Sequence, residues 1–203
     1  MDIYQHDKAF RDTGFKFIAG IDEAGRGPLA GPVVASAVIL PADLKIDGLR
    51  DSKKVPEKER ESLFWQILLS SLDIGVGIVE HNEIDRINIL QATRLAMKKA
   101  VADLCIKPDA LIIDAVALPS INIKQFSIIK ADAKSASVAA ASLIAKYTRD
   151  IIMLRYHSLY PEYNFNKHKG YCTEEHLRLL NLHGPCRIHR KSFRKVMDLE
   201  LPF

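Results

Sequence analysis

The chain has 203 residues, and 29 Lys and Arg against 25 Asp and Glu give it a formal net charge of +4. With 48% hydrophobic and 27% charged residues, it is typical of one globular domain, and disorder is excluded. No apolar run approaches the roughly 20 residues of a membrane helix, so we expect no membrane partner. The polar first residues predict neither a secretory signal nor a transit peptide. Without a CxxC pair, the three cysteines favour a reducing, cytoplasmic location: Cys105, Cys172 and Cys186.

The predicted elements, in chain order, indicate an α/β fold. Apolar, β-branched runs predict five strands, at 17–21, 33–40, 72–80, 110–114 and 126–130. Apolar residues at helical spacing predict four helices, at 59–70, 82–104, about 133–157 and about 173–182, with Thr173 as the N-cap of the last. The first three strands are close enough in sequence to be antiparallel neighbours, and helix-length crossovers are expected between the later ones. We therefore predict a mixed five-stranded sheet flanked by helices.

The C-terminal part of the chain is basic and rich in histidine. Five Lys and Arg and no acid lie between Arg187 and Lys195, and five of the seven histidines follow residue 156. Such a segment could lie along phosphates, although a short charge cluster is more often a solvated helical face. A zinc site is not expected, because the cysteines and histidines here lack paired spacing: Cys172, His176, His183, Cys186 and His189. We predict one domain over 1–203, with a core at about 16–157 and a helical extension at about 158–203.

The most informative stretch is the glycine-rich segment 20–32, GIDEAGRGPLAGP. It approximates a P-loop, but Arg26 and Gly27 stand where the phosphate-binding Lys and the metal-binding Ser or Thr should be. It also approximates a dinucleotide-binding fingerprint, but a strand follows where a helix is required. We therefore interpret Asp22 and Glu23 as the centre of a site, supported by glycines whose backbone can approach a ligand closely. An acidic turn that only ends a strand is the alternative.

Two further acids follow predicted strands. Asp114 ends a buried strand, where an unpaired charge is costly unless a cation, a metal or protonation relieves it. Asp132 precedes the long helix, a position that fits an N-cap and also fits an active site at the strand ends of an open α/β sheet. Oxygen-only ligands of this kind suit Mg²⁺ or Mn²⁺ better than zinc.

Seven blocks of the sequence occur in the order of a known family. They are GIDEAGRGPLAGPVVASAVIL, DSKK, NILQATRLAMKKA, LIIDA, ADAKSASVAAASLIAKYTRD, HKGYCTEEHL and HRKSF, and they span most of residues 16–194. The chain thereby resembles ribonuclease HII, the type 2 ribonuclease H family. Members of that family often have Gly before the fourth acid, where this chain has Ala131.

The resemblance implies a ribonuclease H-like fold and a metal-dependent endoribonuclease. Its expected substrates are the RNA strand of RNA–DNA hybrids and duplex DNA with single embedded ribonucleotides, cut on their 5′ side. Two ions of Mg²⁺ or Mn²⁺ would support hydrolysis that leaves 5′-phosphate and 3′-OH ends. We expect a monomer. A non-catalytic hybrid-binding module and the sister enzyme ribonuclease HIII are the alternatives. The four acids argue against the first, and the 16 residues before the first predicted strand argue against the second.

By position, the resemblance also implies roles for individual residues. The metal ligands and catalytic acids would be Asp22, Glu23, Asp114 and Asp132. The loop that senses the ribose 2′-OH would be Gly25, Arg26 and Gly27. Tyr171 would stack on the sugar that follows the ribonucleotide, although an aromatic residue after Gly170 could equally be a packing residue. Ser52 and Lys53 are expected to contact the phosphate backbone.

Overall fold

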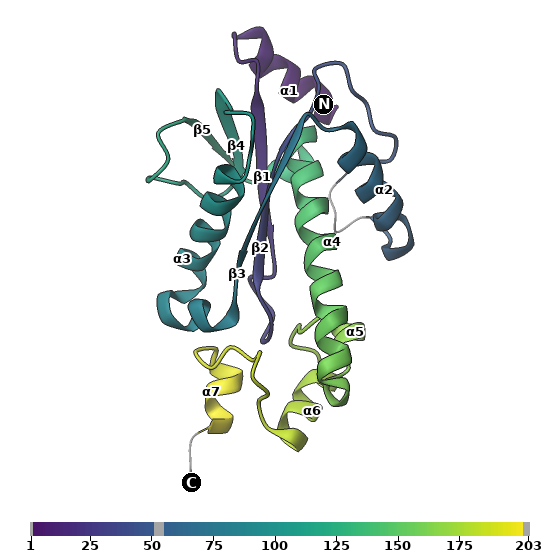
Figure 1. The fold of residues 1–203 in the computed structure, drawn as a ribbon, viewed down its shortest axis with the longest axis vertical. Coiled ribbons are helices and arrows are strands. Elements are labelled where there is room, and N and C mark those ends of the chain that lie inside the picture. The colour runs from purple at the N-terminus through teal and green to yellow at the C-terminus, as the bar shows by residue number, and fades with distance from the viewer. Residues whose placement is uncertain (1, 51–54, 201–203) are drawn as a thin grey trace.

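The structure is a computed structural model that describes residues 2–50 and 55–200 (Figure 1). Its centre is a five-stranded sheet in the order β3-β2-β1-β4-β5. The strands are β1 (Ile18–Ala24), β2 (Val33–Ile39), β3 (Asp73–Val79), β4 (Ala110–Asp114) and β5 (Lys124–Ile128). β1, β2 and β3 pair antiparallel, whereas β4 pairs parallel with both β1 and β5. The predicted mixed sheet is confirmed.

Helices cover both faces of this sheet (Figure 1). The helices are α1 (Ile3–Asp12), α2 (Glu57–Ser70), α3 (His81–Ala102), α4 (Ala136–Leu159), α5 (Phe165–His168), α6 (Glu174–His183) and α7 (Arg194–Glu200). The sequence analysis predicted α2, α3, α4 and α6 but missed the short helices α1, α5 and α7. Short helices draw most of their stability from tertiary contacts, which local sequence does not reveal. For α1, one such contact is the buried Asp7 carboxylate, which accepts a hydrogen bond from the Ser137 amide at 2.8 Å.

The backbones of α3 and α4 approach the sheet closely because glycines face them. A Cβ atom at Gly77 of β3 would lie 1.9 Å from the Ala96 carbonyl oxygen of α3. A Cβ atom at Gly20 of β1 would lie 2.1 Å from the Ser137 carbonyl carbon of α4. Side chains therefore cannot separate these backbones, and the first turns of α4 lie directly against the strand that carries Asp22.

The connection between β4 and β5 agrees with the predicted elements. No helix was predicted between these strands, and residues 115–123 contain none. The Gln125 side chain shapes this connection, since it accepts from the Leu118 amide and donates to the carbonyls of Leu118 and Ile121, all at 2.9 Å. One amide side chain thus replaces the backbone hydrogen bonds that a helix would supply.

The C-terminal segments pack against the end of α4 and against the loop between β1 and β2. Their shared apolar cluster includes Leu29 and Ala30 of that loop, Met153 of α4, and Phe165 and Ile188. The predicted N-cap of α6 is confirmed, because the Thr173 hydroxyl accepts from the His176 amide at 3.1 Å. The division of the chain near residue 158 stays a prediction. Across the described residues, no helix has both the length and the hydrophobicity that crossing a membrane requires.

Candidate active site

The ends of β1 and β4 bring two acids to the same level of the sheet. Ile21 and Ile113 are paired neighbours in the parallel ladder, so Asp22 and Asp114 directly follow on strands about 5 Å apart. Both acids lie on the face of the sheet that α4 covers. Glu23 follows in β1 with its side chain alternating to the other face, but β1 ends one residue later. Its carboxylate can therefore turn to the same strand end.

A cavity of about 240 Å³ opens at this strand end. The acids on its wall are Asp22, Glu23 and Asp114. The β1–β2 loop contributes Ala24, Gly25, Arg26 and Gly27, and the remaining wall consists of Ser142, Lys146 and Tyr171. The structure thus brings together three of the predicted acids, the predicted loop and the predicted tyrosine, which come from three separate parts of the chain.

Asp132 lies outside the described lining of this cavity. It is buried in a short 3-10 turn, Ala131–Ala133, directly before α4. The amide of Ala131 donates to Asp114 Oδ1 at 3.0 Å, so this turn contacts the acids even though Asp132 does not line the cavity. The N-cap of α4 is Ser135, so the N-cap alternative for Asp132 was wrong. The predicted phosphate contacts Ser52 and Lys53 lie outside the described residues.

Burial and mutual repulsion dominate the electrostatics of the acids. Burial raises the pKa of Asp22 well above its usual value, and the charges of Glu23 and Asp114 raise it further. Hydrogen bonds from the Ser142 hydroxyl and from the Glu23 amide, at 2.8 Å, partly oppose this rise in pKa. Burial also raises the pKa of Glu23, against the opposing effect of Arg26 Nη1 at 3.1 Å from Glu23 Oε1. Ionising Asp22 and Glu23 together is therefore unfavourable in the protein alone.

The donor set fits a divalent cation of the Mg²⁺ or Mn²⁺ type. Glu23 Oε2 is buried and accepts no hydrogen bond within the described structure, and such an oxygen is stabilised by a cation. Carboxylate oxygens are also the ligands that these hard ions prefer. Within the described residues, however, no three His, Cys, Asp or Glu side chains are already spaced as a complete metal site. Binding would therefore require these carboxylates to adjust.

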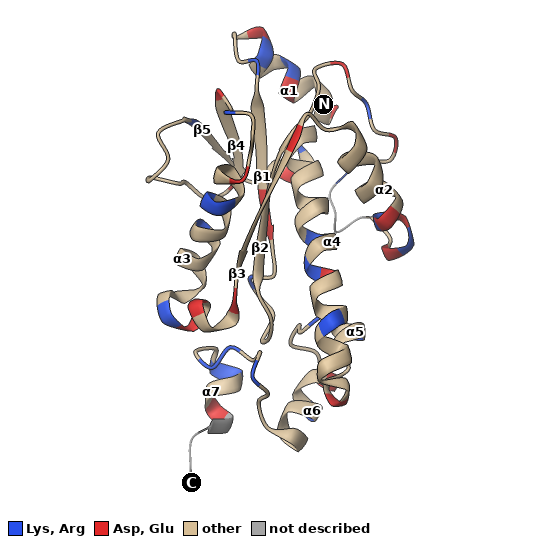
Figure 2. Cartoon of the chain, viewed as in Figure 1, with Lys and Arg blue, Asp and Glu red and all other residues tan. Residues whose placement is uncertain are grey.

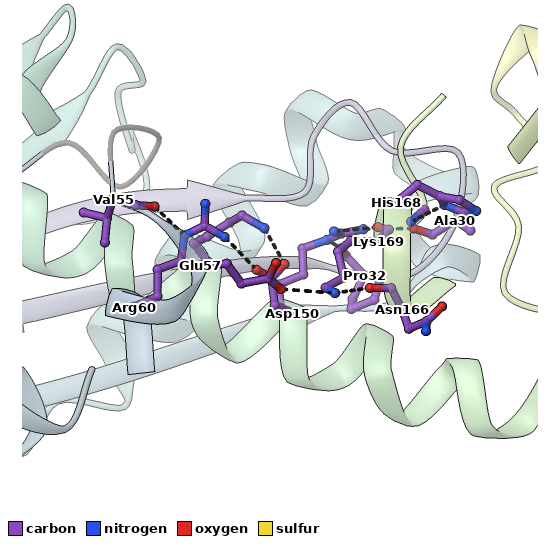
Figure 3. Close-up of polar contacts among 12 residues, drawn as sticks. Ala30, Pro32, Val55, Glu57, Arg60, Asp150, Asn166, His168 and Lys169 are labelled. Atoms are coloured by element: carbon purple, nitrogen blue, oxygen red, sulfur yellow. Dashed lines mark hydrogen bonds and ion pairs between the residues drawn. The ribbon is translucent and has the colours of Figure 1, made fainter. Parts of the chain in front are cut away.

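Two arginines with no exposed surface, Arg149 and Arg190, hold the β1–β2 loop. Arg149 of α4 donates to the carbonyl oxygens of Pro32, Ala30 and Lys169, each at 3.0 Å. Figure 3 shows Ala30, Pro32 and Lys169 close to one another. A single guanidinium group thus joins the loop to the segment that carries Tyr171.

Arg190 binds the loop from the C-terminal segment. Its Nη2 donates to Gly25 O at 2.6 Å and to Pro32 O at 3.1 Å, its Nη1 donates to Arg26 O at 3.0 Å, and its Nε donates to Gly31 O at 3.0 Å. The expectation that the basic segment lies along phosphates is therefore wrong for Arg190, which faces the interior.

Sequence reasoning missed four residues of this region. Ser142 and Lys146 of α4 line the cavity, and Arg149 and Arg190 support it. The signal for the α4 residues was present, because 142, 146 and 149 share one face of a helix at spacings of four and three. For Arg190 no local signal existed, since an arginine within a basic run looks like a surface residue until its burial is known.

The histidines of the C-terminal segment form a buried hydrogen-bond chain. The Cys186 amide donates to His189 Nδ1 at 2.9 Å, so His189 Nε2 carries the proton that is shared with His176 Nε2 at 3.1 Å. The other nitrogen of His176 then donates to Tyr171 O at 2.9 Å. Both rings are therefore neutral and fully engaged. No metal-binding group of cysteines and histidines occurs in the described residues.

Comparison with known proteins identifies the family. A family model described as Ribonuclease HII matches residues 19–196. The chain belongs to the ribonuclease HII family. It is similar to the ribonuclease HII of Acetivibrio thermocellus, with 56% identity over 94% of this chain and 74% of that protein. It is also similar to the ribonuclease HII of Bacillus subtilis, with 52% identity over 98% of this chain and 77% of that protein.

A solved structure supports the fold. The ribonuclease H2 from Pyrococcus horikoshii OT3 superposes with a TM-score of 0.77 at 27% identity, covering 91% of this chain and 97% of that one. The predicted ribonuclease H-like fold is thereby confirmed. As a ribonuclease HII family member, the chain is a hydrolase, and the prediction of an enzyme is confirmed.

Replacing Asp22 by Asn should stabilise the metal-free protein, because it removes a buried charge that Glu23 and Asp114 repel. Because the pKa of Asp22 is raised in the folded state, ionisation of this group lowers the free energy of unfolding. This loss is absent below the pKa of the unfolded chain, about 3.9, and complete above the pKa of the folded protein. In EDTA at pH 7.5 we expect an increase in Tm of about 2–4 °C, equivalent to about 1 kcal/mol. Mg²⁺ or Mn²⁺ should raise the Tm of the wild type more than that of the variant. Exposed Asp12→Asn is the control, and an unchanged or lower Tm for Asp22→Asn in EDTA would contradict the electrostatic account.

The histidine chain should make the protein less stable in mild acid. Burial lowers the pKa of His176 to about 4 and that of His189 to about 3. Between about pH 6.5 and pH 4 the unfolded chain therefore binds more protons than the folded chain, and the free energy of unfolding falls as the pH falls. Urea unfolding at pH 7.5 and pH 5 should show this loss, and His189→Gln should reduce it. Exposed His183→Gln should keep the wild-type loss, and an equal reduction in both variants would refute the assignment.

Proposed function

We propose that this protein is a divalent-metal-dependent endoribonuclease that cleaves the RNA strand of RNA–DNA hybrids. It also incises duplex DNA on the 5′ side of single embedded ribonucleotides and leaves 5′-phosphate and 3′-OH ends. One observation carries the proposal: the acids at the ends of β1 and β4 share a cavity with Gly25, Arg26, Gly27 and Tyr171. Membership of the ribonuclease HII family supports the substrate class.

The acids would hold the metal. Asp22, Glu23 and Asp114 face the cavity, and Asp132 lies in the turn whose amide binds Asp114. When bound, two divalent cations would activate a water molecule and stabilise the leaving 3′ oxygen. Ser142 keeps Asp22 in place through its hydroxyl hydrogen bond. Lys146 Nζ is held beside Asp150, at the wall of the cavity, where its charge favours a phosphate.

The loop would identify the ribose. The 2′-OH is the group that distinguishes RNA from DNA at a given nucleotide, and it is small enough to be read by main-chain groups. Gly25 and Gly27 allow the backbone of the loop to approach a sugar closely. Gly25 has a φ of +97°, and its missing Cβ would meet Arg149 Nε at 2.2 Å, so this position requires glycine.

Tyr171 would recognise the deoxyribose after the ribonucleotide. Its side chain is 41% exposed and lines the cavity, so its ring is available to a substrate. The Arg149 guanidinium lies 5.7 Å from the ring centroid on the protein side. The tyrosine is thus supported from behind, which suits a stacking platform.

Basic residues near the C-terminus would position the duplex. Figure 2 shows Lys and Arg on the segment leading into α7 and on its first turn. The exposed members are Arg187, Lys191, Arg194 and Lys195. Contacts to phosphates supply affinity without sequence preference, so binding should weaken as the salt concentration rises.

The cellular setting follows from the cysteines. All three are free thiols, with Cys105 and Cys172 exposed. This supports a reducing compartment, and we propose a cytoplasmic location. The monomeric state stays a prediction.

Replacing Asp22 by Asn should abolish metal-dependent cleavage of a duplex with one ribonucleotide, because a carboxylate ligand is lost. We expect a decrease of at least about 100-fold in kcat, with duplex binding retained. Wild-type cleavage should stop in EDTA and return with Mg²⁺ or Mn²⁺, and the cut should map to the 5′ side of the ribonucleotide. Near-normal cleavage by the variant would overturn the metal assignment. Wild-type binding without cleavage would instead favour a non-catalytic hybrid-binding module.

Replacing Tyr171 by Ala should impair cleavage at the RNA-to-DNA junction more than it impairs folding, because the side chain is exposed. We expect a loss of about tenfold or more in kcat/KM, comparable with one stacking interaction of 1–3 kcal/mol. Tyr171→Phe keeps the ring and should retain most activity. Thermal unfolding is measured in parallel, and a fall in Tm that matches the loss of activity would assign Tyr171 a packing role.

A further inference from the structure

The hydrogen bonds of Arg149 and Arg190 have an unusual set of partners. Both side chains lie in the interior with no exposed surface. In the described structure, their hydrogen bonds all end on backbone carbonyl oxygens: those of Gly25, Arg26, Ala30, Gly31, Pro32 and Lys169. A buried arginine is usually paired with a carboxylate. Here the guanidinium groups instead determine which way a stretch of main chain faces.

This arrangement orients the amides of the proposed sensing loop. In a trans peptide, the carbonyl of one residue and the N–H of the next point in opposite directions. The carbonyls of Gly25 and Arg26 point to Arg190, so the N–H groups of Arg26 and Gly27 point away from it. These residues line the cavity. Arg190 therefore aims two consecutive main-chain donors at the side where a substrate would lie.

Arg149 sets the position of Tyr171 relative to the same loop. It binds the loop at Ala30 and Pro32 and binds the Tyr171 segment at Lys169 O, while its guanidinium lies behind the Tyr171 ring. The Leu29 amide adds a direct link to Gly170 O at 2.8 Å. The Arg149 side chain and this backbone hydrogen bond thus together hold the loop at a defined distance from the Tyr171 segment.

Arg190 is itself held in place from a second element. Its amide donates to Leu29 O at 2.8 Å. The carboxylate of Asp85 in α3 accepts from the amides of Lys191 and Ser192, each at 2.9 Å, and from the Ser192 hydroxyl at 2.6 Å. The guanidinium therefore has little freedom to follow a loop that moves. The fixed Arg190 guanidinium therefore stabilises one conformation of the loop.

Both side chains remain charged at neutral pH. Burial lowers the pKa of Arg149 to about 10 and that of Arg190 to about 9, still well above 7. Their charge lies behind the peptide groups and polarises them, which strengthens the N–H donors on the opposite side. The hydrogen bonds of the two arginines and their positive charges thus both favour N–H donors that face the cavity.

We propose that Arg149 and Arg190 are positioning residues that set the preference for a ribonucleotide over a deoxyribonucleotide. They do so by turning the amides of Arg26 and Gly27 toward the 2′-OH and by holding Tyr171 at a defined distance from them. This inference rests on the proposed function, since it assumes that the loop reads the ribose.

The test compares binding of two otherwise identical duplexes, one all-DNA and one with a single ribonucleotide, in EDTA so that no cleavage occurs. Arg149→Lys and Arg190→Lys keep a positive charge but lose the planar set of donors that reaches several carbonyls. The wild type should prefer the ribonucleotide duplex by about tenfold, the equivalent of one net hydrogen bond. Each variant should reduce this ratio to less than about twofold.

The matched control is Arg11→Lys. Arg11 also donates to a backbone carbonyl, Leu40 O at 2.9 Å, but near the opposite end of β1. This variant should keep the full ribonucleotide preference. Thermal unfolding establishes that each protein is folded at the assay temperature.

The outcomes distinguish failure of the proposed function from failure of the positioning role of the arginines. A wild type that shows no preference for the ribonucleotide duplex contradicts ribose reading by the loop, and so the proposed function. A wild type with the preference and folded lysine variants that retain it overturn the positioning role alone. Failure of both lysine variants to fold also overturns that role, because the arginines would then serve the fold as a whole.

Discussion

The architecture of the site depends on hydrogen bonds between two buried guanidinium groups and the carbonyl oxygens of the β1–β2 loop. Leaving even one such carbonyl unpaired in the interior costs about 1–3 kcal/mol, so the loop is strongly biased to one conformation. Arg149 belongs to α4, and Arg190 to the C-terminal segment. The sheet, the long helix and the extension therefore converge on a loop that local sequence leaves flexible. This explains how a glycine-rich segment can be held in one conformation.

The acids beside this loop are destabilised in the protein alone, whereas the loop itself is stabilised. Asp22 is buried and Glu23 is partly buried beside Asp114, and their pKa values are raised because burial and repulsion disfavour their charged forms. Burial and repulsion of these carboxylates lower the free energy of unfolding, and binding of a divalent cation would raise it again. The arginines stabilise a fixed loop in the protein alone, whereas the acids would be stabilised by a bound cation.

The sequence predicted the sheet and the positions of Asp22 and Asp114 at strand ends, because strand ends and helical spacing are local signals. Asp22 and Asp114 each follow an apolar strand, and the family resemblance placed Gly25 and Tyr171 with them. What it could not predict depends on distant contacts. Helix α1 is held to α4 through Asp7, and the course of the connection after β4 depends on the hydrogen bonds of Gln125. Arg190 looked like a surface cation because burial is a property of the assembled fold.

We propose that main-chain amides of the loop read the ribose. This proposal is tested most directly by amide hydrogen exchange at Arg26 and Gly27 in the Asp22→Asn variant, bound to a duplex with one ribonucleotide or to the same duplex in all-DNA form. The account predicts slower exchange of these two amides with the ribonucleotide duplex than with DNA, at equal occupancy of the protein. Equal exchange with the two duplexes would contradict it.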